Sequence, residues 1–167
     1  MSQNAFYNHS LLERYAGSAR KDPATILSYF GLMPFVFAAV ILAFHVYAIP
    51  YLGKVTNIIS VYGLIVSTFL SGIHWGQHLE RSNPWHLYLP IVSNTSAVAL
   101  WVCYLVLPFN YFSLVLSASF LIALIIDKTL YDAGLLNDRY FYTRCIVTAI
   151  VIVLVLLSAW LVNHHFF

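Results

Sequence analysis

The chain has 167 residues, of which 61% are apolar, 17% aromatic and only 8% charged. A water-soluble domain carries roughly 25% charged residues, so the composition excludes an ordinary soluble protein. The net charge of +2 is too small to indicate a nucleic-acid partner, and the lipid bilayer is the expected partner instead.

Five apolar stretches predict an all-α, polytopic membrane helix bundle, because each is close to the roughly 20 residues that cross a bilayer. They run over residues 24–47, 56–77, 87–107, 111–126 and 145–162, and turn residues or charges separate them. Residues 24–167 are therefore expected to form one transmembrane domain. Residues 1–23 are expected to form an amino-terminal segment. Its capping-box pattern at Ser10 to Glu13 predicts a short interfacial helix over about 11–16.

The basic residues predict the orientation of the spans. Seven of the eight fall on the amino-terminal side of the predicted spans, and Lys54 alone falls on the other. In a bacterial inner membrane this asymmetry places the amino terminus, the segment 78–86 and the charged connection 127–144 in the cytoplasm. We therefore expect a multi-pass inner-membrane protein with a cytoplasmic amino terminus.

Small and polar residues share one face of the second predicted span. At 100° per residue, this face carries Thr56 and His78 at its ends, with Ser60, Gly63, Ser67, Ser71 and His74 between them. Such a stripe allows another helix to approach closely and to hydrogen-bond across the contact, so it is expected to face the bundle interior. Gly72 and Gly76 form a separate pair on another side, where a second small-residue packing contact is expected.

Two histidines end this stripe. His74 and His78 are four residues apart, so both side chains project from the same side of a helix. That spacing suits a bis-imidazole metal or haem site if further ligands come from elsewhere. The alternatives are a packed, hydrogen-bonded histidine pair, or a role in proton transfer or quinone contact.

Other polar residues are expected at the same depth. Asn94 lies near the start of the third span, Asp127 follows the fourth and Arg144 precedes the fifth. A carboxylate at the membrane edge is costly unless it is paired, and Arg144 is its natural partner. We expect His74, Asn94, Asp127 and Arg144 to form one polar cluster, either as a structural brace or as a ligand site. Nothing in the sequence requires a cofactor; haem, a metal or a quinone are the candidates.

Three segments resemble one known family. They are Gly31-Leu32-Met33-Pro34-Phe35, Ser71-Gly72-Ile73-His74-Trp75-Gly76, and Asp127 with Gly134-Leu135, Tyr140 and Arg144. They resemble the domain-of-unknown-function 3429 family, which includes bacterial inner-membrane proteins and mitochondrial transmembrane protein 69. The resemblance extends from about Tyr29 to the end of the fifth span. In the last loop, Asn137, Arg139 and Thr143 replace the Pro, Trp and Leu of the family pattern. The family brings no established activity.

The sequence contains no P-loop, dinucleotide-binding glycine pattern, HExxH, CxxC or nucleophile-elbow serine. This favours a non-enzymatic scaffold, accessory or assembly factor, with another inner-membrane complex or a second copy of the chain as its partner. The alternatives are a haem-, metal- or quinone-binding membrane protein that uses the His/Asp/Arg cluster, and a small transporter or proton pathway.

Overall fold

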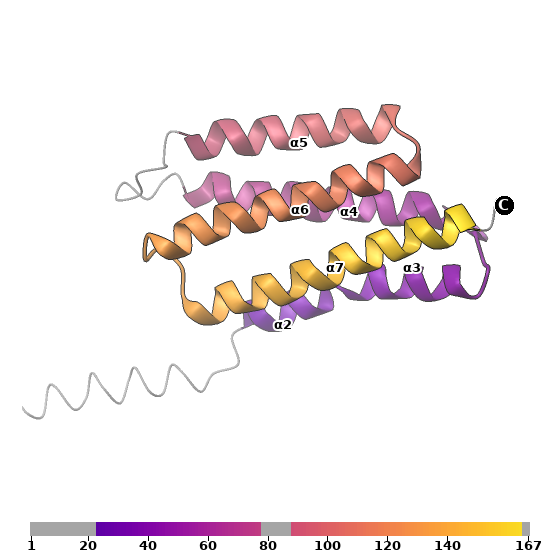
Figure 1. Cartoon of the computed structure of the whole chain (residues 1–167), viewed down its shortest axis with the longest axis horizontal. Helices are drawn as coiled ribbons and strands as arrows, with labels where there is room; N and C mark the ends of the chain where they lie inside the picture. The colour runs from indigo at the N-terminus through magenta and orange to yellow at the C-terminus, as the bar shows by residue number, and fades with distance from the viewer. Residues whose placement is uncertain (1–22, 78–87, 165–167) are drawn as a thin grey trace, which may run out of the picture.

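A computed structural model describes residues 23–77 and 88–164 as an all-helical bundle with one small hairpin (Figure 1). The predicted interfacial helix at 11–16 and His78 lie outside these residues. The elements in chain order are α2 (Pro23–Phe30), α3 (Met33–Ala43), β1 (Ala48–Ile49), β2 (Gly53–Lys54), α4 (Val55–Gln77), α5 (Tyr88–Val106), α6 (Phe109–Asp132) and α7 (Asp138–His164).

Within the described residues, five helical segments are long and apolar enough to cross a membrane. The first consists of α2 and α3 together, and α4 to α7 supply the other four. Their outward faces carry large apolar side chains such as Phe37, Trp101 and Val153, which suits contact with acyl chains. The chain is therefore a multi-pass membrane protein, as its composition predicts.

The first span is broken between α2 and α3. Pro34 stands in the first turn of α3, where no N–H is needed for a hydrogen bond within the helix. If α2 and α3 formed one continuous helix, Pro34 could not donate to the carbonyl one turn earlier. Across the break, the Tyr62 hydroxyl of α4 donates to the Gly31 carbonyl over 3.0 Å. A carbonyl in an interrupted membrane helix needs such a partner, so α4 stabilises the break.

A two-stranded antiparallel hairpin connects α3 to α4. β1 pairs with β2 through Ala48 opposite Lys54 and Ile49 opposite Gly53. Tyr51 and Gly53 have positive φ angles of 66° and 83°, which the tight turn requires. The sequence indicates a break here through Pro50 and Gly53, but not the strands. We call this the hairpin end of the bundle, and the opposite end the α6–α7 end.

The helices pack as a ring with one helix added outside it. α3 contacts α4 and α7, and α6 contacts the same two helices, so these four enclose a core. α5 packs on the outer side of α4 and α6, and α2 packs against α7 (Figure 1). Phe35 at the centre meets Tyr62 and Phe120 edge-on, with ring centroids 5.0 and 6.4 Å apart.

The connection between the last two spans is much shorter than expected. Residues 127–144 were predicted to be a charged connection, but α6 continues to Asp132 and α7 begins at Asp138. Buried Leu130 continues the inner face of α6, and the rings of Tyr131 and Phe141 stack with centroids 4.6 Å apart. Gly134, with a φ of 76°, ends the turn. Asp127 and Arg144 consequently both lie inside helices.

Candidate functional site

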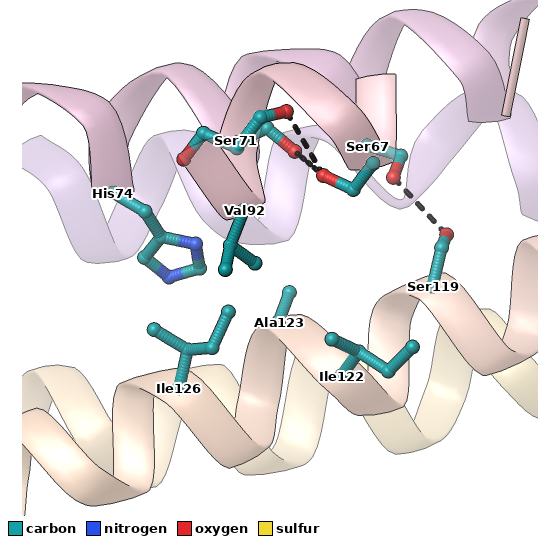
Figure 2. A pocket seen from close by; sticks show the side chains of 10 residues that line it. Ser67, Ser71, His74, Val92, Ser119, Ile122, Ala123 and Ile126 are labelled. Carbon is teal, nitrogen blue, oxygen red and sulfur yellow. Dashed lines mark hydrogen bonds between the residues drawn. The ribbon is translucent and has the colours of Figure 1, made fainter. Parts of the chain in front are cut away.

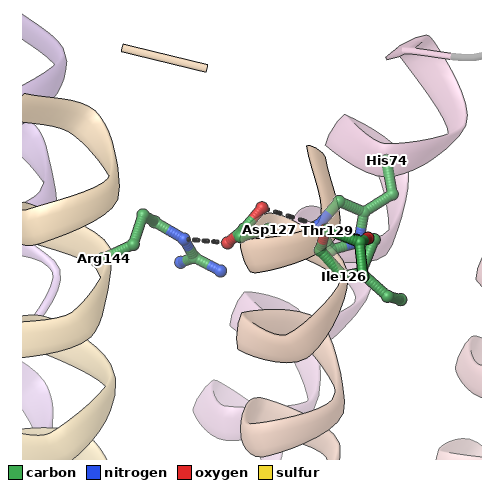
Figure 3. Close-up of polar contacts among 5 residues, drawn as sticks. All are labelled: His74, Ile126, Asp127, Thr129 and Arg144. Atoms are coloured by element: carbon green, nitrogen blue, oxygen red, sulfur yellow. Dashed lines mark hydrogen bonds and ion pairs between the residues drawn. The ribbon is translucent and has the colours of Figure 1, made fainter. Parts of the chain in front are cut away.

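Three side chains from three helices meet inside the bundle near the α6–α7 end. Asp127 of α6 lies between the other two, His74 and Arg144 (Figure 3). His74 Nε2 lies 2.9 Å from Asp127 Oδ1, and Arg144 Nε donates to Asp127 Oδ2 over 2.7 Å. All three side chains are buried, and Asp127 has no exposed surface. We call these residues the His–Asp–Arg group.

Helix geometry positions each member of this group. His74 lies in the last turn of α4, and Arg144 lies in the second turn of α7. Asp127 occupies the buried face of α6 with Ala123 and Leu130, at helical spacing. The sequence predicts that His74, Asp127 and Arg144 approach one another, and the structure brings them together.

The charges of the group balance. A carboxylate can only accept hydrogen bonds, so the proton between it and His74 belongs on Nε2. With a neutral imidazole, one negative and one positive charge remain, which is the least costly state for a buried group. The bond to Asp127 uses one of the five N–H groups of Arg144, and the others make no hydrogen bond with another described residue.

The described residues do not fit a metal or haem site. No group of three or more His, Cys, Asp or Glu side chains comes together among residues 23–77 and 88–164. Nε2 of His74 is already bonded to Asp127, and the Arg144 guanidinium occupies the position beside the carboxylate where a cation would bind. The role of His78 as a second ligand stays a prediction.

Asn94 does not join the group. Its side chain is exposed and donates to the Pro90 carbonyl of its own helix over 2.9 Å. Its neighbour Ser93 is buried instead. Successive helical residues differ by 100° in direction, so the inward position in this polar run falls on Ser93 rather than on Asn94.

The predicted stripe on α4 faces the bundle interior. Ser60, Ser67 and His74 are buried, and Ser71 is half-buried. The Ser67 and Ser119 hydroxyls lie 3.1 Å apart, and those of Ser71 and Ser96 lie 3.2 Å apart. The stripe thus hydrogen-bonds to both α5 and α6. At Gly63 an added Cβ would collide with the end of the Leu116 side chain, so a larger residue here would force Leu116 to shift.

The second glycine pair behaves differently from the prediction. Gly72 and Gly76 are exposed, and a Cβ added to either would meet nothing within 4 Å. The expected packing contact at these glycines is therefore not made within the described chain. They lie on the side of α4 that points away from the stripe, and small size alone does not distinguish a packed face from an open one.

A cavity of about 400 Å³ lies beside the His–Asp–Arg group, between α2, α3, α4, α6 and α7. We call it the larger cavity. Its wall is mostly apolar, with Phe35, Leu70, Phe120 and Val151 among the buried side chains that form it. Leu27 of α2 and Phe69 of α4 also line it and are 69% and 66% exposed, so the cavity opens sideways between these helices.

One row of α7 supplies polar groups to the larger cavity. Tyr140, Arg144 and Thr148 are spaced four residues apart and all line it. Thr148 is only 2% exposed, yet its hydroxyl makes no hydrogen bond with another described residue, and neither does that of Tyr140. Sequence reasoning missed Thr148 and Tyr62 as site residues. The four-residue spacing after Tyr140 and Arg144 was the available signal for Thr148.

A second, much smaller cavity of about 50 Å³ lies on the other side of α6, between α4, α5 and α6. We call it the serine cavity. Figure 2 shows His74 at one end, Ser67 and Ser71 above, and Ile122, Ala123 and Ile126 of α6 below. Val92, Ser93, Ser96 and Ser119 complete its lining. The His–Asp–Arg group therefore begins at one cavity and ends at the other.

Comparisons with known proteins give a family but no activity. A family model described as protein of unknown function (DUF3429) matches residues 20–160, which confirms the predicted resemblance. No curated protein and no solved structure matches the chain.

Proposed function

The chain belongs to the DUF3429 family, and we propose from its geometry that it binds a lipid-soluble ligand of the quinone class in the larger cavity. The observation that carries this proposal is the row of Tyr140, Arg144 and Thr148 on α7. These residues direct N–H and O–H groups with unused hydrogen-bonding capacity into a cavity that is otherwise apolar. Ligand sites typically combine an apolar wall with a few convergent polar groups in this way.

The chemistry of the row selects the ligand. Arg144 and Tyr140 offer hydrogen-bond donors, so the ligand head should carry acceptors such as carbonyl oxygens. Asp127 already neutralises Arg144, which favours a neutral head over an anion in this low-dielectric site. A ring-sized head with two carbonyls and an apolar tail meets both requirements.

The shape of the cavity fits the same ligand. Its volume of about 400 Å³ lies within the range of roughly 300–1,000 Å³ that is usual for small-molecule sites. The polar row lies near the α6–α7 end of the larger cavity. Further into the bundle, the lining from α7 becomes apolar at buried Val151. A tail can leave between Leu27 and Phe69, both exposed towards the acyl chains.

We also propose that the protein resides in a bacterial inner membrane, with its amino terminus and its α6–α7 end in the cytoplasm. The support is the distribution of basic residues: Lys54 lies in the hairpin, whereas Lys128 and Arg139 lie at the α6–α7 end. Reporter fusions at the two ends of the chain should report opposite sides of the membrane. Fusions that report the same side would contradict this topology.

The direct test is quinone binding to the purified full chain in lipid nanodiscs. We expect decylubiquinone to bind saturably in isothermal titration calorimetry. Thr148→Val keeps the shape of the side chain and removes the hydroxyl. This loss should weaken binding by about fivefold, which corresponds to about 1 kcal/mol for one hydrogen bond. Thr143→Val is the matched control, because Thr143 lies on the same helix but donates to the Arg139 carbonyl and does not line the cavity.

Three outcomes would count against the proposal. One is the absence of saturable binding to the wild-type chain. Another is an unchanged affinity of the Thr148→Val variant. The third is palmitate binding as tightly as decylubiquinone, which would assign the cavity to lipid chains instead.

The accessory or assembly role stays a prediction. Its structural support is the open face of Gly72 and Gly76, where a helix of another subunit could approach closely. Replacing both glycines with leucine should abolish a complex that native gel electrophoresis detects, without unfolding the chain. A complex that survives both replacements would remove this support.

A further inference from the structure

The serine cavity contains polar groups that protein contacts leave unsatisfied. Ser93 is 5% exposed and lines the cavity, yet its hydroxyl makes no hydrogen bond with another described residue. The hydroxyls of Ser67, Ser71, Ser96 and Ser119 are each bonded to another hydroxyl or to a backbone carbonyl. Each still has lone pairs that can accept, so the cavity presents both donors and acceptors.

His74 presents its second ring nitrogen to this side. Nε2 is bonded to Asp127, and His74 also lines the serine cavity. With the proton on Nε2, Nδ1 is left as an acceptor, and it makes no hydrogen bond with another described residue. Two groups from two helices, Ser93 and His74, are therefore buried, polar and without a protein partner at the same small space.

The size of the cavity fits water. A site of at least about 10–15 Å³ with two or more polar partners is enough for one buried water, and this one measures about 50 Å³. A neighbouring groove of about 240 Å³ lies between α4 and α5. Ser71 and Ser93 line both spaces, so they lie between the groove and the cavity, and exposed Asn94 lines the groove as well.

We propose that the serine cavity is a water site and that its water exchanges a proton with Nδ1 of His74. In this step a proton arriving from the groove forms a new O–H bond at one end of the water chain. At the other end an O–H bond breaks and an N–H bond forms at Nδ1, so the water stays neutral while Nε2 keeps its proton towards Asp127. No electrons are transferred, and the His–Asp–Arg group changes from neutral to a charge of +1. The proposal goes beyond ligand binding in the larger cavity and does not depend on it.

The surroundings of His74 fit this exchange. α6 contributes Asp127, whose fully buried carboxylate lies 2.9 Å from Nε2 of His74. α7 contributes Arg144 and Tyr140, which lie beyond Asp127 on the side of the larger cavity. α5 contributes Val92, Ser93 and Ser96 to the serine cavity, and none of these is titratable. Proton entry to the group is therefore expected from the side of the serine cavity.

The test is solid-state NMR on the full chain, labelled with ¹⁵N-histidine and reconstituted in liposomes. The His74 signals are assigned by their loss in His74→Gln. We expect magnetisation from mobile water to reach His74 Nδ1 quickly, and we expect the nitrogen shifts to show a proton on Nε2, the atom that contacts Asp127. Ser93→Leu fills the entry and should abolish the fast transfer. Thr95→Leu, on the exposed side of the same helix, should leave it unchanged.

The wild-type measurement alone can overturn the proposal. If transfer to His74 Nδ1 is as slow as transfer to the buried Leu116 backbone amide, the cavity is dry. Wild-type transfer rates in Ser93→Leu would also overturn it, because water would then reach His74 by another route. If Ser93→Leu does not fold, Ala97→Leu is used in its place. Ala97 lines the groove but not the serine cavity, so Ala97→Leu blocks the groove and should also abolish the fast transfer.

Discussion

The two cavities differ in lining and in size although one group of three side chains connects them. The larger cavity is walled by aromatic and aliphatic side chains and opens towards the acyl chains between α2 and α4. The serine cavity is about one-eighth of its volume, and half of its lining residues are serines. The first suits an apolar ligand with a polar head, and the second suits water.

The difference follows from the helices on each side. On one side of α6, the serine stripe of α4 hydrogen-bonds to Ser119, and the side chains of Ile122, Ala123 and Ile126 leave only a small space. On the other side the first span is interrupted between Phe30 and Met33, and residues on both sides of this break line the larger cavity. The larger cavity thus lies beside the break in the first span.

Asp127→Asn should have the largest effect on stability, because it removes the negative charge that lies between His74 and Arg144. Arg144 would be left buried without a counter-ion, and breaking a buried pair costs about 3–5 kcal/mol. We expect a marked loss of thermal stability in nanodiscs. Asp132→Asn is the control on the same helix, because its pair with Lys128 is mostly exposed at 3.5 Å and should contribute little. Equal melting temperatures for Asp127→Asn and the wild type would contradict the assigned role of the group.

Gly63→Leu should have the next largest effect, because it places a large side chain where α4 packs directly against Leu116 of α6. The new side chain would collide with Leu116, and overpacking of this kind costs about 1–3 kcal/mol. Leu116→Ala in the same chain should restore part of the lost stability, since the two positions share one contact. Gly72→Leu is the control with open space around it. Thermal unfolding of these three variants and the wild type distinguishes a packed glycine from an open one.

Val147→Phe tests whether the two cavities bind different molecules. It fills part of the larger cavity with a ring, and we expect it to weaken decylubiquinone binding by about tenfold, or about 1.4 kcal/mol. Ser93→Leu fills the serine cavity and should leave that affinity unchanged. Titration calorimetry measures both variants. A larger loss from Ser93→Leu than from Val147→Phe would reverse the assignment of the two cavities.

Tyr62→Phe should have the smallest effect. It removes the hydrogen bond from α4 to the Gly31 carbonyl at the break in the first span, and one such bond contributes about 0.5–1.5 kcal/mol. The thermal midpoint should fall slightly. Amide hydrogen exchange in α2 and in the first turn of α3 should increase more than in α7. Uniform changes across the helices would show that α4 does not stabilise the break.

The spans and the His–Asp–Arg group could be predicted from the sequence for physical reasons. A membrane requires about 20 apolar residues per crossing and satisfied backbone amides, so the spans are evident in the composition. A carboxylate among apolar residues requires a partner, which indicated Arg144 and His74 for Asp127. Both predictions follow from the cost of burying polar or charged groups in a membrane, and neither prediction requires knowledge of how the helices pack.

The cavities and the facing of single residues could not be predicted in the same way. Ser93, Asn94, Thr95 and Ser96 are polar on every side of α5, so no periodic pattern shows that Ser93 faces inward and Asn94 outward. Gly63 and Gly72 have the same side chain, and only the position of Leu116 separates their environments. The larger cavity is lined by residues of five helices at once, and Pro34 permits the adjoining break between α2 and α3 but does not require it.

The most direct test of the two-cavity account is photolabelling with a quinone that carries a ring azide, followed by mass spectrometry of the full chain in nanodiscs. We expect labelled positions on α2 and on the first three turns of α7, near Ser28, Tyr140 and Thr148, and we expect excess decylubiquinone to prevent labelling. Labelling of Ser93 or Ser96 in the serine cavity, or labelling of outward-facing residues that decylubiquinone does not reduce, would contradict the account.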